Sequence, residues 1–288
     1  MEQYKSTYGL VGYPVQHSLS PLMHNAAFQE LGVDAVYKLF PLQEGELEPF
    51  FSDLKKDGSP IFGLNVTVPY KEKVLVYMDS LSPFAEKVGA VNTVVVSAKR
   101  QLTGHNTDGP GFLTHLTELG FNTAGKRVSI LGAGGAARAI VTVLCLVPER
   151  PEAVLIYDID HHKAEALVQD LGQRFDTRLI KVVHSLDDLN LEISDLLINA
   201  TPIGMKISDP CLLEGFQVSR DMLVYDLIYN PAETRLLKWA KEQGAKTSNG
   251  LGMLFYQGVL AFQHWADVQL DKAVKDKMWA SLKTGLKS

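Results

Sequence analysis

The sequence predicts an α/β fold with two domains, on the basis of three observations. Short apolar runs alternate with helical patterns almost from end to end, which is typical of the α/β class. The 288 residues are enough for roughly two domains of ordinary size. A second series of alternating runs begins near residue 127, after a connecting segment opened by Gly109, Pro110 and Gly111.

The first domain is expected to be an α/β domain with a well-marked first helix. Its strands correspond to the apolar runs Tyr8–Gly12, Ala35–Phe40, Ile61–Val68, Val91–Val96 and Leu102–His105. Ser20 as N-cap, Pro21 at the first helical position and Gly32 after the last turn define the helix between the first two strands. Lys71 is expected to begin a helix after the third strand.

The second domain is expected to be a parallel sheet with helices between its strands. The expected strands are Arg127–Leu131, Ala153–Tyr157, Ile180–Val183, Asp195–Ile198 and Leu223–Tyr225, and the expected helices are Gly135–Val147 and Asp160–Leu171. Most of these strands are continuous apolar runs, which indicates burial on both faces of the sheet. We expect residues 1–110 to form the first domain, helices within 250–288 to return to it, and residues 111–249 to form the second.

Composition argues against several classes of protein. A net charge of −5 and scattered lysines give no reason to expect a nucleic-acid partner. Cys145 and Cys211 are too few for a disulfide framework and lack metal-ligand spacing. The apolar run Ala139–Val147 is about half of what spans a bilayer, and the first residues lack a signal-peptide core. We therefore expect a cytoplasmic protein without a metal or a membrane partner.

A glycine-rich segment follows the first strand of the second domain and opens its first helix. Gly132 permits a tight turn, and Gly134 lets backbone amides approach a pyrophosphate. Ala137 occupies the third position of the GxGxxG pattern, where a small residue allows helix–strand packing. The N–H groups at the start of the helix would face the anion. This arrangement predicts a Rossmann-type dinucleotide-binding domain.

Asp158 ends the next strand, 26 residues beyond Gly132. A carboxylate at this place would accept hydrogen bonds from both ribose hydroxyls of NAD and would repel the 2′-phosphate of NADP. NAD is therefore favoured over NADP, although both remain possible cofactors. The alternative is that Asp158 merely caps the helix that starts nearby.

Polar side chains interrupt the apolar pattern of the first domain at several places. They are Ser18, Ser20, Asn65, Thr67, Lys71, Asn92, Thr93, Asn106, Thr107 and Asp108. Each has a structural alternative: Ser20 and Asp108 could cap helices, and Asn92 could mark a bend at a strand end. Together they would offer hydroxyl, amide, ammonium and carboxylate groups to a small polyhydroxylated anion.

Seven short motifs resemble those of the shikimate dehydrogenase family, in family order over nearly the whole chain. They are His17–Pro21, Asn65–Lys71, Gly89–Thr93, Asn106–Gly109, Gly132–Ala136, Asn199–Met205 and Asn249–Met253. The resemblance implies a substrate domain, a Rossmann domain that binds NAD(P), and C-terminal helices that return to the substrate domain. It also implies reversible hydride transfer between shikimate and 3-dehydroshikimate in aromatic amino acid synthesis, carried out by a monomer or a homodimer.

The resemblance also assigns roles to individual residues. Lys71 and Asp108 match the catalytic pair, and Ser18 and Ser20 match the residues that hold the substrate carboxylate. The ring hydroxyls would be held by Thr67, Asn92, Asp108 and Gln257, with Tyr229 nearby. The cofactor residues would be Gly132, Ala133, Gly134, Gly135, Ala136, Asp158, Thr201, Leu227, Gly250 and Met253.

The chain departs from many NADP-using members of this family at one place. Those members carry Asn-Arg-Thr at the end of the second Rossmann strand, whereas this chain carries Asp158, Ile159 and Asp160. In this it is similar to NAD-preferring quinate/shikimate dehydrogenases, but Ser20 stands where those enzymes often have threonine. Three hypotheses follow: a shikimate dehydrogenase, a quinate-first catabolic enzyme, and a metabolite-sensing paralogue without activity. The role of Lys71 also stays open between acid/base and electrostatic catalysis.

Overall fold

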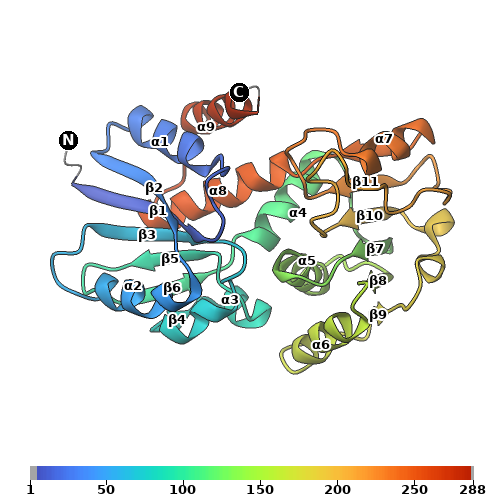
Figure 1. Ribbon diagram of the computed structural model, residues 1–288, viewed down its shortest axis with the longest axis horizontal. Coiled ribbons are helices and arrows are strands. Elements are labelled where there is room, and N and C mark those ends of the chain that lie inside the picture. Colours follow the sequence, from blue (N-terminus) through green and yellow to red (C-terminus); the bar gives the residue numbers. More distant parts are fainter. Residues whose placement is uncertain (1–4, 287–288) are drawn as a thin grey trace. The chain divides into compact units, whose positions relative to one another are not determined.

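The computed structural model describes residues 5–286, and the chain divides into two compact units (Figure 1). Unit 1 comprises Met1–Gly111 and Phe255–Ser288, and unit 2 comprises Phe112–Leu254. The chain passes from unit 1 to unit 2 within α4, Asp108–Glu118, and returns within α8, Leu251–Ala266. Each unit contains one six-stranded sheet, so the predicted α/β class is confirmed.

The sheet of unit 1 is mixed, with strand order β2-β1-β3-β5-β6-β4. Its strands are β1 Ser6–Gly12, β2 Ala35–Pro41, β3 Ile61–Val66, β4 Ser80–Leu81, β5 Thr93–Val96 and β6 Leu102–His105. β1 pairs in parallel with β2 and β3, whereas β5 is antiparallel to β3 and to β6. The carboxyl ends of β1, β3 and β6 therefore meet the amino end of β5 at one edge of the sheet.

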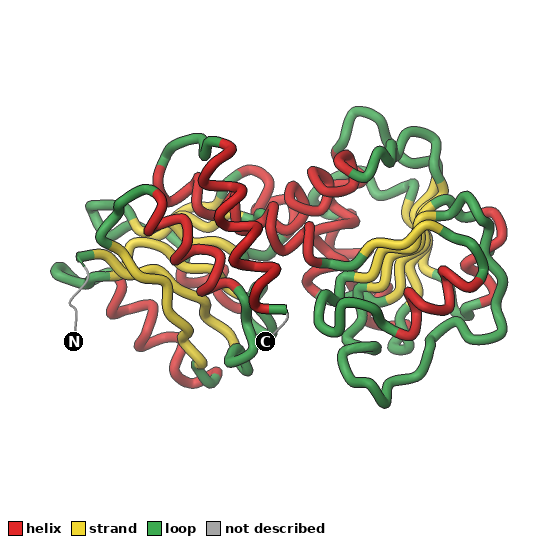
Figure 2. The backbone as a smooth tube through the Cα atoms, turned by 90° about the horizontal axis from the view of Figure 1, so that it is seen from above, coloured by secondary structure: helices red, strands yellow, loops and turns green. Residues whose placement is uncertain are grey.

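Helices cover both faces of this sheet (Figure 2). They are α1 Ser20–Glu30, α2 Leu47–Leu54, α3 Pro83–Val88, α8 and α9 Lys272–Gly285. Alternation along β3 separates the two faces, because Trp265 of α8 covers Gly63, whereas Leu64 belongs to a core with Phe51 of α2. α1 packs beside α9, where a side chain at Gly285 would meet Leu22 (Figure 1).

The sheet of unit 2 is entirely parallel, with strand order β12-β11-β10-β7-β8-β9. Its strands are β7 Arg127–Leu131, β8 Ala153–Tyr157, β9 Ile180–Val182, β10 Leu196–Asn199, β11 Leu223–Asp226 and β12 Lys246–Ser248. Read from β9, this is the doubly wound order, which confirms the predicted Rossmann-type domain. In such sheets ligands bind beyond the carboxyl ends of the strands, at the point where the order reverses.

The helices of unit 2 are α5 Gly135–Leu146, α6 His161–Gly172 and α7 Arg235–Glu242, together with most of α4. Alternation along β11 again separates two faces. Val224 joins a core with Leu236 of α7, whereas the ring of Tyr225 meets Phe112 of α4 at 5.1 Å between centroids. No helix within residues 5–286 is long and apolar enough to span a bilayer.

Two local predictions about the first domain are wrong. Ser20 is not an N-cap, because Leu19 already has helical dihedral angles and Ser20 is the first residue of α1. Lys71 begins no helix: it lies in a turn before the 3₁₀ helix Lys73–Tyr77. After that helix the chain is drawn back to the sheet, where the Asp79 N–H donates to Leu102 O and its carboxylate accepts from Leu102 N.

Candidate active site

A buried ion pair lies at the edge of unit 1 where β1, β3 and β6 end. Lys71 follows β3, and Asp108 begins α4 just after β6. Lys71 Nζ lies 2.6 Å from Asp108 Oδ2, and the two side chains are 14% and 8% exposed. A charge this buried is stable only when it is paired and hydrogen-bonded, so the pair depends on its surroundings.

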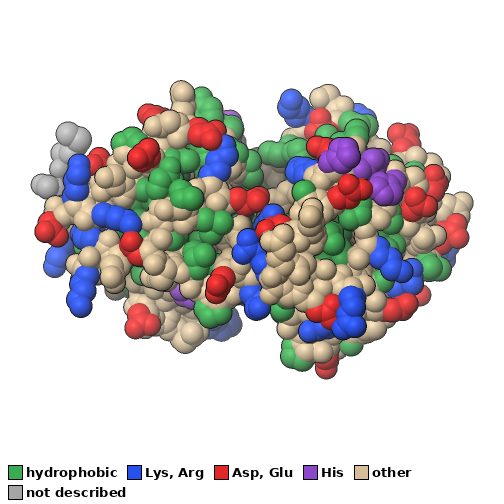
Figure 3. Space-filling model, turned by 90° about the horizontal axis from the view of Figure 1, so that it is seen from below, with side chains coloured by type: hydrophobic (Ala, Val, Ile, Leu, Met, Phe, Trp, Pro, Cys, Tyr) green, Lys and Arg blue, Asp and Glu red, His purple; other side chains and the backbone are tan. Residues whose placement is uncertain are grey.

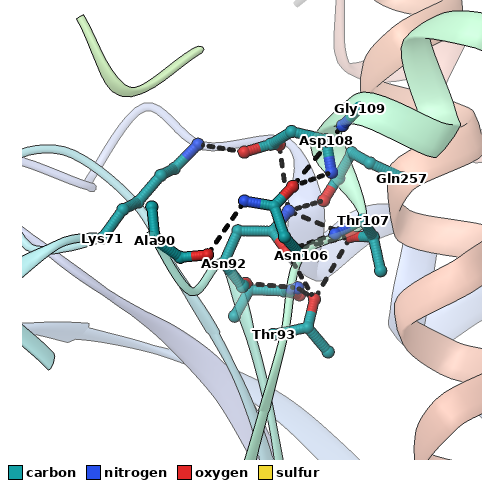
Figure 4. A network of polar contacts seen from close by, with 10 residues as sticks. Lys71, Ala90, Asn92, Thr93, Asn106, Thr107, Asp108, Gly109 and Gln257 are labelled. Atoms are coloured by element: carbon teal, nitrogen blue, oxygen red, sulfur yellow. Dashed lines mark hydrogen bonds and ion pairs between the residues drawn. The ribbon is translucent and has the colours of Figure 1, made fainter. Parts of the chain in front are cut away.

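Asn92 supplies those surroundings for Asp108 (Figure 4). Its Nδ2 donates to Asp108 Oδ1 and to Thr107 Oγ1, both at 2.9 Å. Its Oδ1 accepts from the Thr107 N–H at 2.7 Å. Asn92 is thus saturated in a buried position, which holds both the carboxylate and the start of α4 in place. The alternative that Asn92 only marks a strand bend does not account for these contacts.

Asn106 and Gln257 complete the network around Asp108 (Figure 4). Asn106 Oδ1 accepts from the Asp108 N–H at 3.1 Å, and its Nδ2 donates to Ala90 O at 3.1 Å. Gln257 Oε1 lies 3.4 Å from Asn92 Nδ2. α8 reaches this place because Gly111 has no side chain, since a Cβ there would lie 2.6 Å from the Gln257 backbone nitrogen.

The two serines and Thr67 come from neighbouring strand ends of the same unit. Ser18 Oγ donates to Ser20 Oγ at 3.2 Å and accepts from the Ser20 N–H at 3.2 Å. The Thr67 N–H donates to Val11 O at 2.9 Å, which ties the segment after β3 to β1. Unit 1 therefore carries every predicted substrate residue except Tyr229, which follows β11 in unit 2.

The predicted glycine turn lies between β7 and α5 in unit 2. Gly132 has a φ of +98°, and a Cβ there would lie 3.0 Å from the Ala200 carbonyl group, so glycine is required at this place. A Cβ on Gly134 would meet nothing within 4 Å, so the turn is open on that side. Gly134 also occupies the N-cap position of α5, where no side-chain cap is present. The turn thus has both the space and the N–H groups that a pyrophosphate needs.

Asp158 holds this turn in place. Its Oδ2 accepts from the Ala133 N–H at 2.8 Å, and its Oδ1 accepts from the Asp160 N–H at 3.0 Å. The N-cap of α6 is Asp160, so the alternative that Asp158 caps this helix is wrong. Lys163 Nζ lies 3.8 Å from Asp158 Oδ2. This cation, in the first turn of α6, was not predicted from the sequence.

Thr201 is fixed by a buried acid at the end of β11. Thr201 Oγ1 donates to Asn199 Oδ1 at 2.7 Å, and Asn199 Nδ2 donates to Asp226 Oδ1 at 3.0 Å. Thr234 donates to the other oxygen of Asp226 at 2.6 Å. Burial raises the pKa of Asp226, and these hydrogen bonds act against it. Asp226 was not among the predicted site residues, although a carboxylate that ends an apolar strand is a recognisable signal.

The remaining cofactor residues surround the start of α8. A Cβ on Gly250 would lie 1.9 Å from Leu227 O, so only glycine allows this approach of the loop after β11. Met253 is buried one turn further along α8. Two residues before Leu227, Tyr225 of β11 lies with its hydroxyl 2.6 Å from His115 Nδ1 of α4. Leu227, Gly250 and Met253 all belong to unit 2.

Histidines gather on the surface at the start of α6, and they form a distinct cluster (Figure 3). His162 Nδ1 and His184 Nε2 lie 3.5 and 3.9 Å from the Glu165 carboxylate, and the rings of His161 and His184 are 5.0 Å apart. Within residues 5–286, no group of three or more histidine, cysteine or acidic side chains is arranged to hold a metal ion.

Comparison with known proteins gives matches over most of the chain. Residues 10–94 match the family model of the shikimate dehydrogenase substrate binding domain. A shikimate dehydrogenase (NADP(+)) from Methanopyrus kandleri is 43% identical over 262 residues, which cover 89% of either chain.

Solved structures with bound ligands are similar over nearly the full length. Shikimate 5-dehydrogenase from Listeria monocytogenes in complex with shikimate and NAD has a TM-score of 0.83 and 36% identity, over 96% of this chain and 98% of that one. Quinate dehydrogenase from Corynebacterium glutamicum in complex with NAD has a TM-score of 0.85 and 30% identity, over 97% and 99%. At this identity and coverage, the chain belongs to the shikimate dehydrogenase family.

Proposed function

We propose that this protein is a shikimate dehydrogenase, which oxidises a ring alcohol of shikimate reversibly with a nicotinamide dinucleotide. The observation that carries the proposal is the Lys71–Asp108 pair, buried in a saturated polar network beside the two serines. An ammonium group held 2.6 Å from a carboxylate is suited to exchange a proton with an alcohol oxygen. A metabolite-sensing protein would have no need of such a pair.

The substrate is assigned to residues 1–110 with 250–288. Ser18 and Ser20 offer two adjacent hydroxyl groups, which suit the two oxygens of a carboxylate. The hydroxyls of the ring are assigned to polar groups at the same sheet edge, and Tyr229, a residue of unit 2, is assigned to the substrate by the family resemblance alone. These groups are Thr67, Asn92, Asp108 and Gln257.

The dinucleotide is assigned to residues 111–249, together with Gly250 and Met253. The turn Gly132–Ala136 fits a pyrophosphate, because it combines an open side at Gly134 with the uncapped start of α5. Thr201, Leu227, Gly250 and Met253 are assigned to the nicotinamide end. When bound, the nicotinamide exchanges a hydride with the carbon that carries the reacting alcohol.

The protein must then handle the proton of that alcohol. One of the three N–H groups of Lys71 is directed at Asp108, so the others can reach the reacting oxygen. Two roles fit this geometry: Lys71 exchanges the proton with the alcohol, or it remains charged and stabilises negative charge developing on the oxygen. In both, Asp108 orients Lys71 and can accept a hydrogen bond from a neighbouring ring hydroxyl.

We further propose that NAD is preferred to NADP, although the relative from Methanopyrus kandleri is named for NADP(+). Asp158 supports the preference, because its side chain is 11% exposed and places a negative charge at the carboxyl end of β8. A carboxylate has about four acceptor sites, and two are used by Ala133 and Asp160, so capacity remains for ribose hydroxyls. Lys163 weakens the expected repulsion of a 2′-phosphate without removing it.

Quinate dehydrogenase is the second candidate function, and one observation favours it. The similar structure from Corynebacterium glutamicum is a quinate dehydrogenase in complex with NAD. The serine at position 20 argues in the other direction, since it leaves the site without the threonine that quinate-using members often carry.

Initial rates with shikimate and quinate, each against NAD and NADP, test these proposals together. We expect the highest kcat/KM for shikimate with NAD. A higher value for quinate would make the second candidate the function, and a higher value with NADP would remove the role given to Asp158. If calorimetry shows that shikimate binds but none of the four substrate and cofactor combinations gives turnover, the metabolite-sensing alternative is established.

A further inference from the structure

Asp226, the last residue of β11, is a fully buried carboxylate at the carboxyl edge of the second sheet. Its Oδ1 accepts from Asn199 Nδ2 at 3.0 Å and from the Ile228 N–H at 3.1 Å, and its Oδ2 accepts from Thr234 Oγ1 at 2.6 Å. Burial raises its pKa, and these hydrogen bonds act against the increase. A buried carboxylate is stable only when it is hydrogen-bonded, so the acid and its three donors fix one another in place.

On one side, Asp226 fixes the segment that follows β10 through the buried amide of Asn199. One proton of Asn199 Nδ2 is directed at Asp226 Oδ1, and the other is donated to Ile203 O at 3.2 Å. Asn199 Oδ1 accepts from the Thr201 N–H at 3.1 Å and from Thr201 Oγ1 at 2.7 Å. The amide has only one orientation, because the Thr201 N–H must meet an oxygen. The path of residues 199–203 therefore depends on Asp226.

These hydrogen bonds set the orientation of the Thr201 side chain. Its single hydroxyl proton goes to Asn199, and its oxygen also accepts from the Ile203 N–H at 3.2 Å. The methyl group of Thr201 lies beside the glycine turn, since a Cβ on Gly132 would lie 3.0 Å from Thr201 Cγ2. The order of the strands reverses between β7 and β10, and a doubly wound sheet binds its ligand at such a point. Thr201 thus borders the crevice expected for the dinucleotide.

On the other side, Asp226 fixes the loop that follows β11. Its hydrogen bond from the Ile228 N–H closes a turn at the start of this loop. The Leu227 N–H donates to Asn199 O at 3.0 Å, and the Gly250 N–H donates to Ile228 O at 3.2 Å. Leu227 and Gly250, both assigned to the nicotinamide end, therefore lie in segments that are tied to the same buried acid.

The turn assigned to the pyrophosphate is held by a different acid. Asp158 Oδ2 accepts from the Ala133 N–H at 2.8 Å, and the Gly132 N–H donates to Tyr157 O at 2.7 Å. Both anchors belong to β8 or follow it, and β7 separates β8 from β10 in the sheet. The hydrogen bonds of Asp226 lead instead to the end of β10, the loop after β11 and the N-cap of α7. The two ends of the dinucleotide site thus have separate supports.

We infer that Asp226 is a positioning residue for the nicotinamide end of the dinucleotide. The inference rests on the proposed function, because that function assigns the dinucleotide to unit 2. Asp226 is fully buried, so it acts through the groups that it holds: Thr201 by way of Asn199, and the loop after β11 directly. Its loss should weaken binding of the nicotinamide half of the cofactor and spare the adenosine half.

Asp226→Ala tests the inference by removing the acceptor of all three donors. We expect the Kd of NAD, measured by calorimetry, to rise about tenfold, which corresponds to the loss of about one net hydrogen bond. ADP-ribose contains the adenosine and the pyrophosphate but lacks the nicotinamide, and its Kd should change by less than about twofold. A substitution that merely loosened unit 2 would weaken the binding of both ligands alike. Neither measurement depends on turnover.

Asp226→Asn is the conservative variant. It keeps one oxygen for Asn199 and Ile228, and its amide group can donate to the oxygen of Thr234. Because the positioning hydrogen bonds survive, the Kd of NAD should return to within about threefold of wild type. A Kd as high as that of Asp226→Ala would show that the negative charge is what matters, and would overturn the positioning role.

Asp195→Ala is the matched control at the opposite edge of the same sheet. Asp195 directly precedes β10, and its carboxylate accepts from Lys126 Nζ at 2.8 Å and from the Arg127 N–H at 2.9 Å. Its removal should lower Tm, because these contacts are lost, but the Kd of NAD and of ADP-ribose should stay within about twofold of wild type. An increase in the Kd of NAD equal to that of Asp226→Ala would show a general loss of stability and would refute the inference.

The outcomes separate this inference from the proposed function. If the wild type turns over shikimate but Asp226→Ala weakens NAD and ADP-ribose equally, the inference fails and the function stands. If the wild type binds NAD without turning over shikimate, and Asp226→Ala weakens NAD alone, the function fails and the inference stands. If the wild type does not bind NAD, both fail. If Asp226→Ala does not fold, Asn199→Ala removes the link to Thr201 and leaves Asp226 bonded to Ile228 and Thr234: the same selective loss supports the inference, and an unchanged Kd of NAD overturns it.

Discussion

Lys71→Met removes the ammonium group of the candidate catalytic pair and keeps most of the side-chain length. We expect turnover of shikimate to fall by about 10² to 10⁴, the range for a positioned acid/base group. The variant also leaves the Asp108 carboxylate buried without its cation. Breaking a buried pair costs about 3 to 5 kcal/mol, and the hydrogen bond from Asn92 at 2.9 Å places this case at the lower end, about 3 kcal/mol.

The two effects can be measured separately. Thermal unfolding should show a decrease in Tm of roughly 6 to 12 °C, at about 2 to 4 °C per kcal/mol for a domain of this size. Adding Asp108→Asn neutralises the orphaned carboxylate, so most of the lost Tm should return while turnover stays low. Reduction of the nicotinamide, followed by its absorbance, gives the turnover.

Lys73→Met is the control for the loss of one lysine charge near the site. Its Nζ forms an exposed ion pair with Glu44, and such pairs contribute little, so kcat and Tm should stay close to wild type. Turnover of Lys71→Met within threefold of wild type would remove Lys71 from the mechanism. A Tm that does not recover in the double variant would show that the stability loss has another cause.

Three further results are expected. The double variant Asp158→Asn, Ile159→Arg should shift the preference toward NADP, both in kcat/KM and in affinity measured by calorimetry. The reason is that a carboxylate that repels the 2′-phosphate is lost and a guanidinium group that can pair with it is gained. An unchanged ratio of the affinities for NAD and NADP would contradict this. Gly132→Ala should lower Tm and dinucleotide affinity, because φ at this residue is +98° and Ala200 would lie 3.0 Å from the added Cβ. Gly134→Ala is the control and should leave Tm unchanged, because a Cβ there would meet nothing within 4 Å. Equal Tm values for the two variants would refute the argument. Burial lowers the pKa of His24 in the folded protein to about 3, so the unfolded chain takes up the proton first as the pH falls from 6.5. The free energy of unfolding of the wild type should therefore decrease by roughly 3 kcal/mol between pH 6.5 and 4 because of this residue. His24→Phe should lose correspondingly less over that range, and parallel stability curves for the two proteins would show that the pKa assignment is wrong.

The elements that were predicted correctly are those with a strong local pattern. The strands of unit 2 are apolar runs buried on both faces, and the glycine turn has a backbone conformation that few other residues adopt. The predictions that failed depend on partners distant in sequence. Lys71 precedes a 3₁₀ helix and not an α-helix, and the segment after that helix is tied to Leu102 through Asp79.

The candidate site was predictable as a set of residues but not as a network. The polar residues of unit 1 interrupt an apolar pattern and could be recognised one by one. Seven motifs in family order indicated the family. Spacing could not show that Asn92 bridges Thr107 and Asp108, or that Asp158 holds the glycine turn through Ala133. Asp226 was not predicted, because the sequence could not show that it is buried and bonded to Asn199 and Thr234.

The return of α8 and α9 to unit 1 has a consequence for how the protein is made. Trp265 and Phe262, which cover one face of the first sheet, are synthesised more than 140 residues after the last strand of that sheet. A nascent chain of the first 111 residues would therefore lack the Trp265 ring that covers Gly63 and packs against Tyr8. Unit 2 is continuous and can fold as soon as it leaves the ribosome. Gln257 arrives with α8, so the polar network around Asp108 is completed only after unit 2 has been synthesised.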